Sequence, residues 1–171
     1  MKDANSLMSP TDLQARCADL LYTEARLLDA RDWDAWLALY LPDAEYWIPA
    51  WDGEHTLTTD PQTEISLIYY ADRSGLEDRV FRLRTNLSSA SVPLPRTCHV
   101  VGNVQAAAQG DDIHVHAHWH CTSFRFKHTH FHAGFYDYRL RADESGALRI
   151  AGKKITLIND VIAEVLDFYH V

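Results

Sequence analysis

The chain has 171 residues, of which 47% are hydrophobic and 23% are charged, a composition typical of a soluble globular protein with one domain. Its 24 acidic and 16 basic residues give a net charge of -8, which argues against a nucleic-acid partner because such binding depends on neutralising phosphates with Lys and Arg. No run approaches the ~20 consecutive apolar residues of a membrane span, and the first ten residues lack the apolar core of a secretory signal. We therefore expect one domain over residues 1–171, in the cytoplasm and without a membrane partner.

Three cysteines, Cys17, Cys98 and Cys121, are widely separated in the sequence. An odd number of scattered cysteines does not indicate a disulfide framework, and the expected cytoplasm is reducing. We expect all three to be buried free thiols.

Two helices are predicted near the start of the chain. Ser9 is a typical N-cap, and leucines at helical spacing follow it, so the first helix is predicted over about residues 10–30. Only Glu24 departs from the apolar pattern of this helix. The second helix is predicted over about residues 33–41, where Pro42 would end it.

A strand is predicted next, over about residues 44–51, and Pro49 within it indicates an edge position or a bulge. The polar segment 52–63 is a loop near the upper end of usual lengths, and such loops tend to be functional or to touch a partner. The apolar run from Ile65 to Tyr70 fits a buried strand or a tight turn into the next helix.

A third helix is predicted over about residues 75–88. Ser74 and Glu77 match a capping box, in which the Ser hydroxyl accepts from the Glu amide while the Glu side chain reaches back. Apolar residues at spacings of four, three and four then form one helix face. This face consists of Leu76, Val80, Leu83 and Leu87.

From Cys98 onward the hydrophobic pattern changes to a period of two, which predicts strands. The breaks between these strands are short enough for hairpins, so neighbouring strands should be antiparallel. Helices followed by an antiparallel sheet indicate an α+β fold. The predicted strands span about residues 98–108, 113–126, 130–141 and 147–159.

Three segments carry a resemblance to a known family: YWIPAWD from Tyr46, DPQTEISLIYY from Asp60 and GLEDRVFRLRT from Gly75. They resemble the small (beta) subunit of aromatic-ring-hydroxylating dioxygenases, and within that family the benzoate, toluate, anthranilate and 2-halobenzoate branch. The resemblance extends from Leu27 to Val171. It implies an NTF2-like (cystatin-like) fold, in which a strongly curved, mostly antiparallel sheet forms a cone around N-terminal helices.

The same resemblance implies a non-catalytic, structural subunit of a multicomponent, NADH-dependent oxidoreductase. In the family, the large (alpha) subunit carries a Rieske [2Fe–2S] cluster and a mononuclear Fe(II). Three large and three small subunits form a hexamer in which the small subunits also contact one another, and a reductase delivers the electrons. The implied substrate is a benzoate-type aromatic carboxylate, such as benzoate or anthranilate, and the large subunit mainly selects it.

The iron ligands of that chemistry are not matched in this chain. A Rieske cluster needs Cys-x-His ligand pairs, whereas Cys98 is followed directly by a histidine and Cys121 by a threonine. The Asp-x2-His-x4-His pattern of the mononuclear site is not completed, because His114 follows Asp111 at the first interval but Trp119 occupies the last position. We expect no cofactor on this chain.

Histidines occupy every second position of the predicted strand 113–126, so their imidazoles share one face. A metal site needs three or four ligands that converge on a point, whereas a row places them in a line. We therefore favour a solvent-facing or subunit-facing side of the sheet, and a small metal-binding protein is a third hypothesis. The row is His114, His116, His118 and His120, and His128, His130 and His132 begin the next strand. The opposite face, expected in the core, carries Ile113, Val115, Ala117, Trp119 and Cys121.

A stand-alone NTF2-like isomerase or dehydratase is the second hypothesis. Many domains of this fold hold an acid or an Asp–His pair in the pocket of the cone, where burial raises the pKa of a carboxyl group toward the working range of a base. Candidate pocket acids are Asp43, Asp60 and Asp137. Each also has an ordinary explanation as a cap, a loop residue or a surface charge, and no spacing singles out a pair.

Surface contacts are the remaining source of function, and aromatic residues and Arg are enriched in interfaces. Tyr46 and Trp47 are adjacent on a strand and should not both point inward, so about half of the aromatic cluster should be available to a partner. The apolar tail from Val161 to Val171 should be docked. The candidate contact residues are Trp47, Trp51, Asp52, Tyr69, Tyr70, Arg73, Glu77, Asp78, Arg79, Arg82 and Arg84, the last three lying off the apolar face of the third helix.

Overall fold

The structure is a computed structural model that describes residues 9–162 and 165–171. Its helices are α1 (Pro10–Ala30), α2 (Trp33–Leu37) and α3 (Ser74–Arg84), with short 3-10 turns η2 (Ser89–Ser91) and η3 (Phe168–His170). Its strands are β1 (Tyr40–Pro49), β2 (Ser66–Tyr70), β3 (Arg96–Gln109), β4 (Asp112–Arg125), β5 (His128–Ala142) and β6 (Leu148–Leu157).

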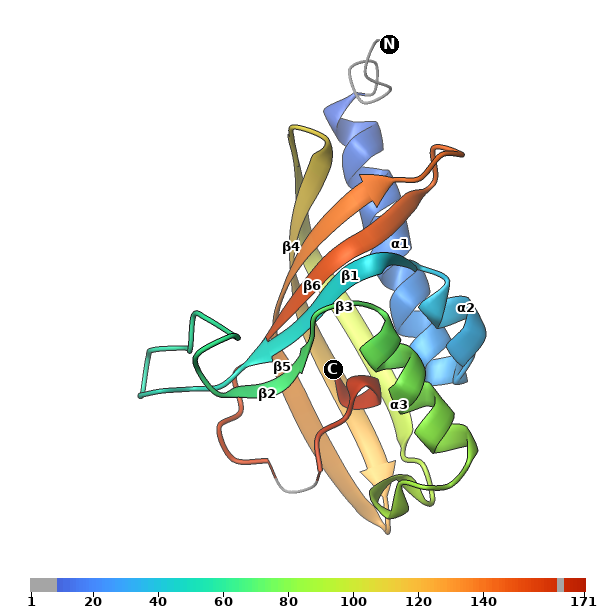
Figure 1. Ribbon diagram of the computed structural model, residues 1–171, viewed down its shortest axis with the longest axis vertical. Helices are drawn as coiled ribbons and strands as arrows, with labels where there is room; N and C mark the ends of the chain where they lie inside the picture. The colour runs from blue at the N-terminus through green and yellow to red at the C-terminus, as the bar shows by residue number, and fades with distance from the viewer. Residues whose placement is uncertain (1–8, 163–164) are drawn as a thin grey trace.

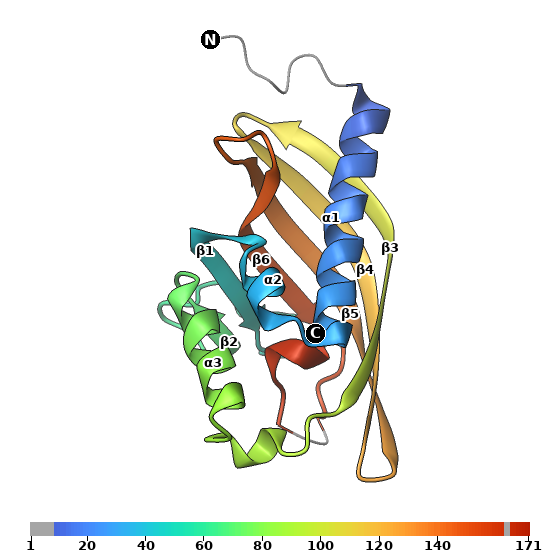
Figure 2. The same cartoon turned by 90° about the vertical axis from the view of Figure 1, so that its right-hand side faces the viewer.

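All described strands belong to one six-stranded sheet in the order β2-β1-β6-β5-β4-β3. Its neighbours are antiparallel except for β1 and β6, which are parallel. The sheet curves around α1, and α2, α3 and the C-terminal turn lie on the same concave side (Figures 1 and 2). The predicted α+β class is confirmed.

The period of two in the second half of the chain is the physical basis of this sheet. On β4, the five residues expected in the core are each at most 3% exposed, while His114, His116 and His118 are exposed on the other face. β4 pairs in continuous register with β5 from Ile113 opposite Leu140 to Arg125 opposite His128. The predicted two-sided character of this strand is therefore confirmed.

The region between α2 and β1 differs from the prediction. α2 ends at Leu37 rather than near residue 41, and Tyr40 already belongs to β1, where it pairs with Ile150 of β6. Pro42 is tolerated because it falls within an irregularity of the β1–β6 pairing. β1 is an interior strand, so the edge position suggested for Pro49 is wrong, whereas the bulge is present between Ile48 and Pro49.

The start of α3 also differs from the prediction. The capping box is wrong: Ser74 is the first helical residue and donates to Asp72, while Glu77 binds Arg73 at 2.7 Å. Asp72 therefore takes the acceptor role that the sequence assigned to the Ser74 hydroxyl. The helix ends at Arg84, so Leu87 lies beyond the apolar face and is 72% exposed.

The core lies between the concave face of the sheet and the helices. The C-terminal tail closes it, because the Phe168 ring stacks on Trp36 with centroids 4.6 Å apart and Val171 is fully buried. Docking of the tail is confirmed for residues 167–171, which are buried, whereas Val161 and Val165 are 83% and 61% exposed and residues 163–164 lie outside the described residues. Cys17 and Cys121 are buried as predicted, but Cys98 is exposed, because the alternation of β3 turns it away from the core.

Candidate functional site

A buried acid lies inside the cone, and we call its surroundings the polar centre: Glu24, Trp36, Tyr40, Tyr138 and Lys153. Oε1 of Glu24 accepts from Nε1 of Trp36 at 3.3 Å, from Nζ of Lys153 at 3.1 Å and from the hydroxyl of Tyr40. Oε2 accepts from the hydroxyl of Tyr138 at 2.5 Å. Glu24 and Lys153 are 1% and 2% exposed. Both carboxylate oxygens therefore accept hydrogen bonds from groups of the chain itself, three at Oε1 and one at Oε2.

The electrostatics of the polar centre keep Glu24 ionised. Burial alone would raise the pKa of this carboxyl, but the positive charge of Lys153 and the tyrosine hydroxyls outweigh it, so the pKa lies below its usual value. The Lys153 ammonium is also 4.2 Å from the ring centroid of Tyr136, a cation–π contact. The arrangement supplies charge compensation, and it leaves no carboxylate oxygen open to abstract a proton.

A second acid, the half-buried Asp29 at the end of α1, forms an Asp–His pair. Its Oδ1 lies 2.6 Å from Nδ1 of His99 and its Oδ2 accepts from the His99 amide at 2.9 Å. Burial works to raise the pKa of Asp29, but the hydrogen bonds from His99 and Thr97 outweigh it and the pKa is lowered. The His99 side chain is 1% exposed, and its Nε2 has no hydrogen-bond partner among the described residues.

The strand register continues this pair across the sheet. His99 lies opposite Cys121, which in turn lies opposite His132. His132 is 4% exposed, and its ring lies 5.3 Å from that of His170 on the C-terminal turn. Burial lowers the pKa of both His132 and His170, that of His170 to about 3. His132 and His170 are therefore neutral in the folded protein near pH 7.

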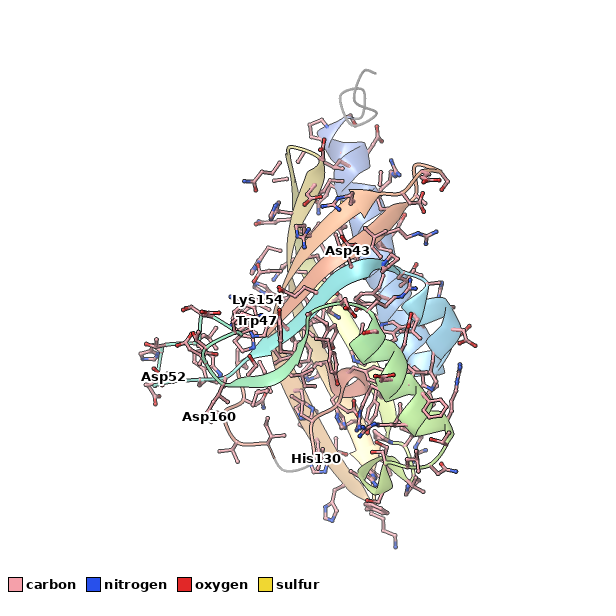
Figure 3. All side chains as sticks on the ribbon, in the orientation of Figure 1. Asp43, Trp47, Asp52, His130, Lys154 and Asp160 are labelled. Carbon is pink, nitrogen blue, oxygen red and sulfur yellow. The ribbon has the colours of Figure 1, made fainter. Side chains whose placement is uncertain are left out.

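None of the three candidate pocket acids lies inside the cone, so that prediction is wrong. Asp43 is exposed on β1 (Figure 3), and Asp60 accepts from Gln62 and Thr63 within the loop. Asp137 projects from the opposite face and lies 2.8 Å from His116. The sequence did contain a signal for the true internal acid, because Glu24 occupies an apolar position of its helix.

The aromatic cluster is more buried than expected. Tyr46 is fully buried and Trp47 is only 8% exposed. The two side chains do alternate, but Trp47 is covered by Lys154, whose ammonium is 4.9 Å from its ring, and by Ser66, which accepts from its Nε1 at 2.9 Å (Figure 3). Trp51 is half-buried and donates to the carbonyl of Leu157. Local side chains thus occupy the space that a partner was expected to take.

The charged candidates on α3 have three kinds of surroundings. Arg79 is turned inward and binds Asp167 of the tail, with Nη2 and Oδ2 2.5 Å apart, so the expectation that it faces solvent or a partner is wrong. Arg84 forms an exposed ion pair with Asp34. The Asp78 and Arg82 side chains are exposed and form no hydrogen bond or ion pair among the described residues.

Between α3, β2 and the tail lies a groove of about 540 Å³, which we call the tail groove. It brings together three of the candidate residues from α3 and one from β2. Asp52 and Tyr69 lie outside it, on the loop after β1 and on the outer side of β2. Its lining consists of Ile68, Tyr70, Gly75, Asp78, Arg79, Arg82, Val165, Leu166 and Asp167.

Within residues 9–162 and 165–171, no group of three His, Cys, Asp or Glu side chains is arranged to hold a metal ion. Two members of the histidine row bond sideways: Nδ1 of His116 to Asp137, and Nδ1 of His118 to Asn103 at 2.9 Å. Among the described helices, none is both long and apolar enough to cross a membrane.

Comparison with known proteins finds similar sequences and similar structures. The chain is 46% identical over 165 residues to the 2-halobenzoate 1,2-dioxygenase small subunit of Burkholderia cepacia, covering 94% of this chain and 99% of that protein. Its structure matches the beta subunit of the benzoate 1,2-dioxygenase from Burkholderia mallei with a TM-score of 0.75 and 41% identity, covering 96% and 98% of the two chains.

The fold and the family follow from two further matches. An NTF2-like protein with a cystatin-like fold from Novosphingobium aromaticivorans matches with a TM-score of 0.60 over 98% of this chain and 99% of that one, and at 15% identity it shows the fold alone. The expected NTF2-like fold is confirmed. The model of the ring hydroxylating beta subunit family matches residues 23–164. Since that match spans most of the sequence, the chain belongs to the ring hydroxylating beta subunit family.

Proposed function

We propose that this protein is the non-catalytic small subunit of a dioxygenase acting on benzoate-type aromatic carboxylates. It assembles with a large subunit that carries the Rieske cluster and the mononuclear iron, as a hexamer of three large and three small subunits with contacts between small subunits. A reductase component supplies electrons to the large subunit. The relatives named for benzoate and 2-halobenzoate dioxygenases support this substrate class.

The observation that carries the proposal is the filled interior of the cone. The carboxylate of Glu24 is bound by four donors from the chain, and aromatic side chains surround it. An interior of this kind stabilises a rigid shape rather than binding a substrate. The contact surface is then sought on the exterior, among the candidates that stay exposed: Asp52, Glu77, Asp78, Arg82 and Arg84.

The test is co-expression with the cognate large subunit. The mass of the purified complex should correspond to equal numbers of the two chains, and benzoate-dependent oxygen uptake should require both of them and a reductase. The small subunit alone should show no oxygen uptake. Oxidation of a benzoate by the isolated chain, or failure of the two chains to associate, would contradict the proposal.

A stand-alone isomerase or dehydratase is the second candidate, and the Asp29–His99 pair favours it. The carboxylate fixes Nδ1 of the imidazole, which leaves a buried Nε2 as a possible base. Asp29→Asn separates the two hypotheses when it is made both in the isolated chain and in the assembled dioxygenase. A structural pair predicts lower stability of the small subunit and unchanged oxygen uptake per intact complex. A stand-alone enzyme predicts isomerase or dehydratase turnover by the isolated wild-type chain, which Asp29→Asn abolishes.

A further inference from the structure

We propose that the tail groove and the adjoining free edge of β2 bind an extended segment of the large subunit that carries a carboxylate beside apolar side chains. This inference rests on the proposed function and names the place and the chemistry of the contact. It follows from three features of the described residues: an unpaired strand edge, an arginine side chain without a hydrogen bond or ion pair, and apolar side chains that line one preformed groove.

The strand edge is the first feature. β2 is the last strand on its side of the sheet and pairs with β1 alone. Every second residue of an edge strand directs its N–H and C=O away from the sheet, and such groups pair readily with another extended chain. Ile68 and Tyr70 of this strand line the groove. A bound segment can therefore form main-chain bonds with β2 while its side chains enter the groove.

The charge of the groove indicates the chemistry of the segment. Of the two arginines that line it, Arg79 is neutralised by Asp167, whereas the exposed Arg82 side chain has no hydrogen bond or ion pair among the described residues. A guanidinium binds a carboxylate through two parallel hydrogen bonds. The nearby Asp78 would repel a segment carrying several acids, so one carboxylate opposite Arg82 fits best.

Apolar residues surround the same place. Val165 of the tail is 61% exposed and lines the groove together with the half-buried Ile68, Tyr70 and Leu166. Exposed apolar side chains gathered around a concave surface are typical of interaction sites. They supply the buried area that a single ion pair cannot, since an exposed pair contributes little on its own.

The groove is also held in shape. A Cβ added at Gly75 would lie 2.3 Å from the Tyr70 ring, so glycine allows the first turn of α3 to pack directly on β2. The opposite wall is fixed because Asp167 binds Arg79, caps the C-terminal turn and leads into the buried Phe168. Its volume of about 540 Å³ lies within the range of about 300–1,000 Å³ typical of sites that enclose a ligand.

The test compares Arg82→Glu with Arg26→Glu, a matched charge reversal at an exposed position of α1. Each variant is titrated with the cognate large subunit, and hydrogen exchange of the β2 amides is measured in the free and the bound protein. We expect Arg82→Glu to weaken association at least tenfold and Arg26→Glu to leave it within twofold. In the wild-type complex, amide exchange over residues 66–70 should slow at least tenfold.

Each outcome has a distinct meaning. Wild-type affinity in Arg82→Glu together with unchanged exchange over residues 66–70 would overturn the inference and leave the proposed function standing. Slow exchange of β2 in the isolated protein that depends on its own concentration would identify a second copy as the occupant and would also overturn it. Absence of any association with the large subunit would remove the proposed function and this inference together.

Discussion

The polar centre and the tail groove contain the same kinds of side chain but use them in opposite ways. In the polar centre, Glu24 and Lys153 neutralise each other, and tyrosine and tryptophan donors bind the remaining lone pairs. In the tail groove, one arginine is neutralised by the tail, while the side chains of Arg82 and Asp78 are exposed and form no hydrogen bond or ion pair among the described residues. One region is complete within the chain, and the other has unused binding capacity.

This difference separates stability from assembly. A buried charge that loses its partner costs several kcal/mol, because it cannot return to water without unfolding the protein. An exposed charge that loses its partner is solvated at little cost. Substitutions in the polar centre should therefore change the free energy of unfolding, and substitutions at the groove should change association with a partner.

The largest effect is expected for Lys153→Met, which leaves the Glu24 carboxylate buried without its cation. We expect unfolding by urea near pH 7 to show a loss of about 3–5 kcal/mol. Without Lys153 the folded-state pKa of Glu24 rises above its unfolded value, so its contribution to stability is present at low pH and lost as pH rises. The deficit relative to the wild type should consequently begin to shrink as the pH falls from 7 toward about 4.5, and it should shrink further below that pH, where the wild type loses the contribution of its ionised Glu24.

The matched control is the double variant Glu24→Gln with Lys153→Met. It removes both charges and keeps one oxygen that can accept from Tyr40 or Tyr138, while the amide NH2 can donate to the hydroxyl of the other tyrosine. It should be more stable than Lys153→Met alone. A double variant that is less stable than the single one would show that Glu24 does not depend on Lys153, and the description of the polar centre would be wrong.

The sequence predicts the general architecture better than these two regions. A period of two places the core residues of β4 correctly because each strand residue alternates between a buried and an exposed face. The polar centre depends on Glu24 and Lys153, which are far apart in the chain and meet only when α1 packs on the sheet. Sequence periodicity marks Glu24 as anomalous but contains no information about its partner.

The same limit explains the errors around α3 and the aromatic cluster. The local pattern indicates a cap at Ser74, but Asp72, two residues earlier, is the acceptor instead and binds the amide and the hydroxyl of Ser74. Alternation sends Trp47 to the outer face, and only the register of β1 with β2 and β6 reveals that Ser66 and Lys154 cover it. The groove itself needs the tail, which arrives from the other end of the chain.

The second largest effect is expected at the tail, which fixes one wall of the groove. Phe168→Ala removes a ring that stacks on Trp36 and meets Trp33 edge-on, with centroids 4.6 and 5.4 Å apart. Replacing a fully packed Phe by Ala costs about 3–4 kcal/mol. The measurement is urea unfolding, with the exposed Phe81→Ala of α3 as the control, which should change stability by less than about 0.5 kcal/mol.

A smaller, pH-dependent effect is expected from the buried histidines beneath the tail. The folded-state pKa values of His132 and His170 are lowered, the latter to about 3. The unfolded chain therefore binds protons below about pH 6.5 that the folded chain does not, and stability falls as the pH falls. Each histidine contributes a slope of at most about 1.4 kcal/mol per pH unit between these limits.

His170→Asn tests this contribution, because its amide oxygen can still accept from the Asp167 amide, as Nδ1 does at 3.1 Å. The groups facing His170 are Asp167, His132, His99, His130 and Arg125. As the pH falls from 7 to 5, the free energy of unfolding should decrease less in the variant than in the wild type, by at most about 1.4 kcal/mol per pH unit. Equal slopes would mean that His170 takes up its proton at the same pH in the folded and the unfolded protein, and the lowered pKa would be wrong.

The smallest effect is expected from the outer face of β4. His118 contacts Phe135 with ring centroids 5.1 Å apart and bonds Asn103, but both contacts are exposed. His118→Gln should therefore change the free energy of unfolding by less than about 0.5 kcal/mol. Calorimetric titration with zinc should give no saturable site that the substitution removes, because Asn103 and Asp137 turn the adjacent imidazoles sideways. A stoichiometric zinc site that is lost in His118→Gln would instead place a binding function on this face. The outer face of β4 would then be a second region with unused binding capacity beside the tail groove.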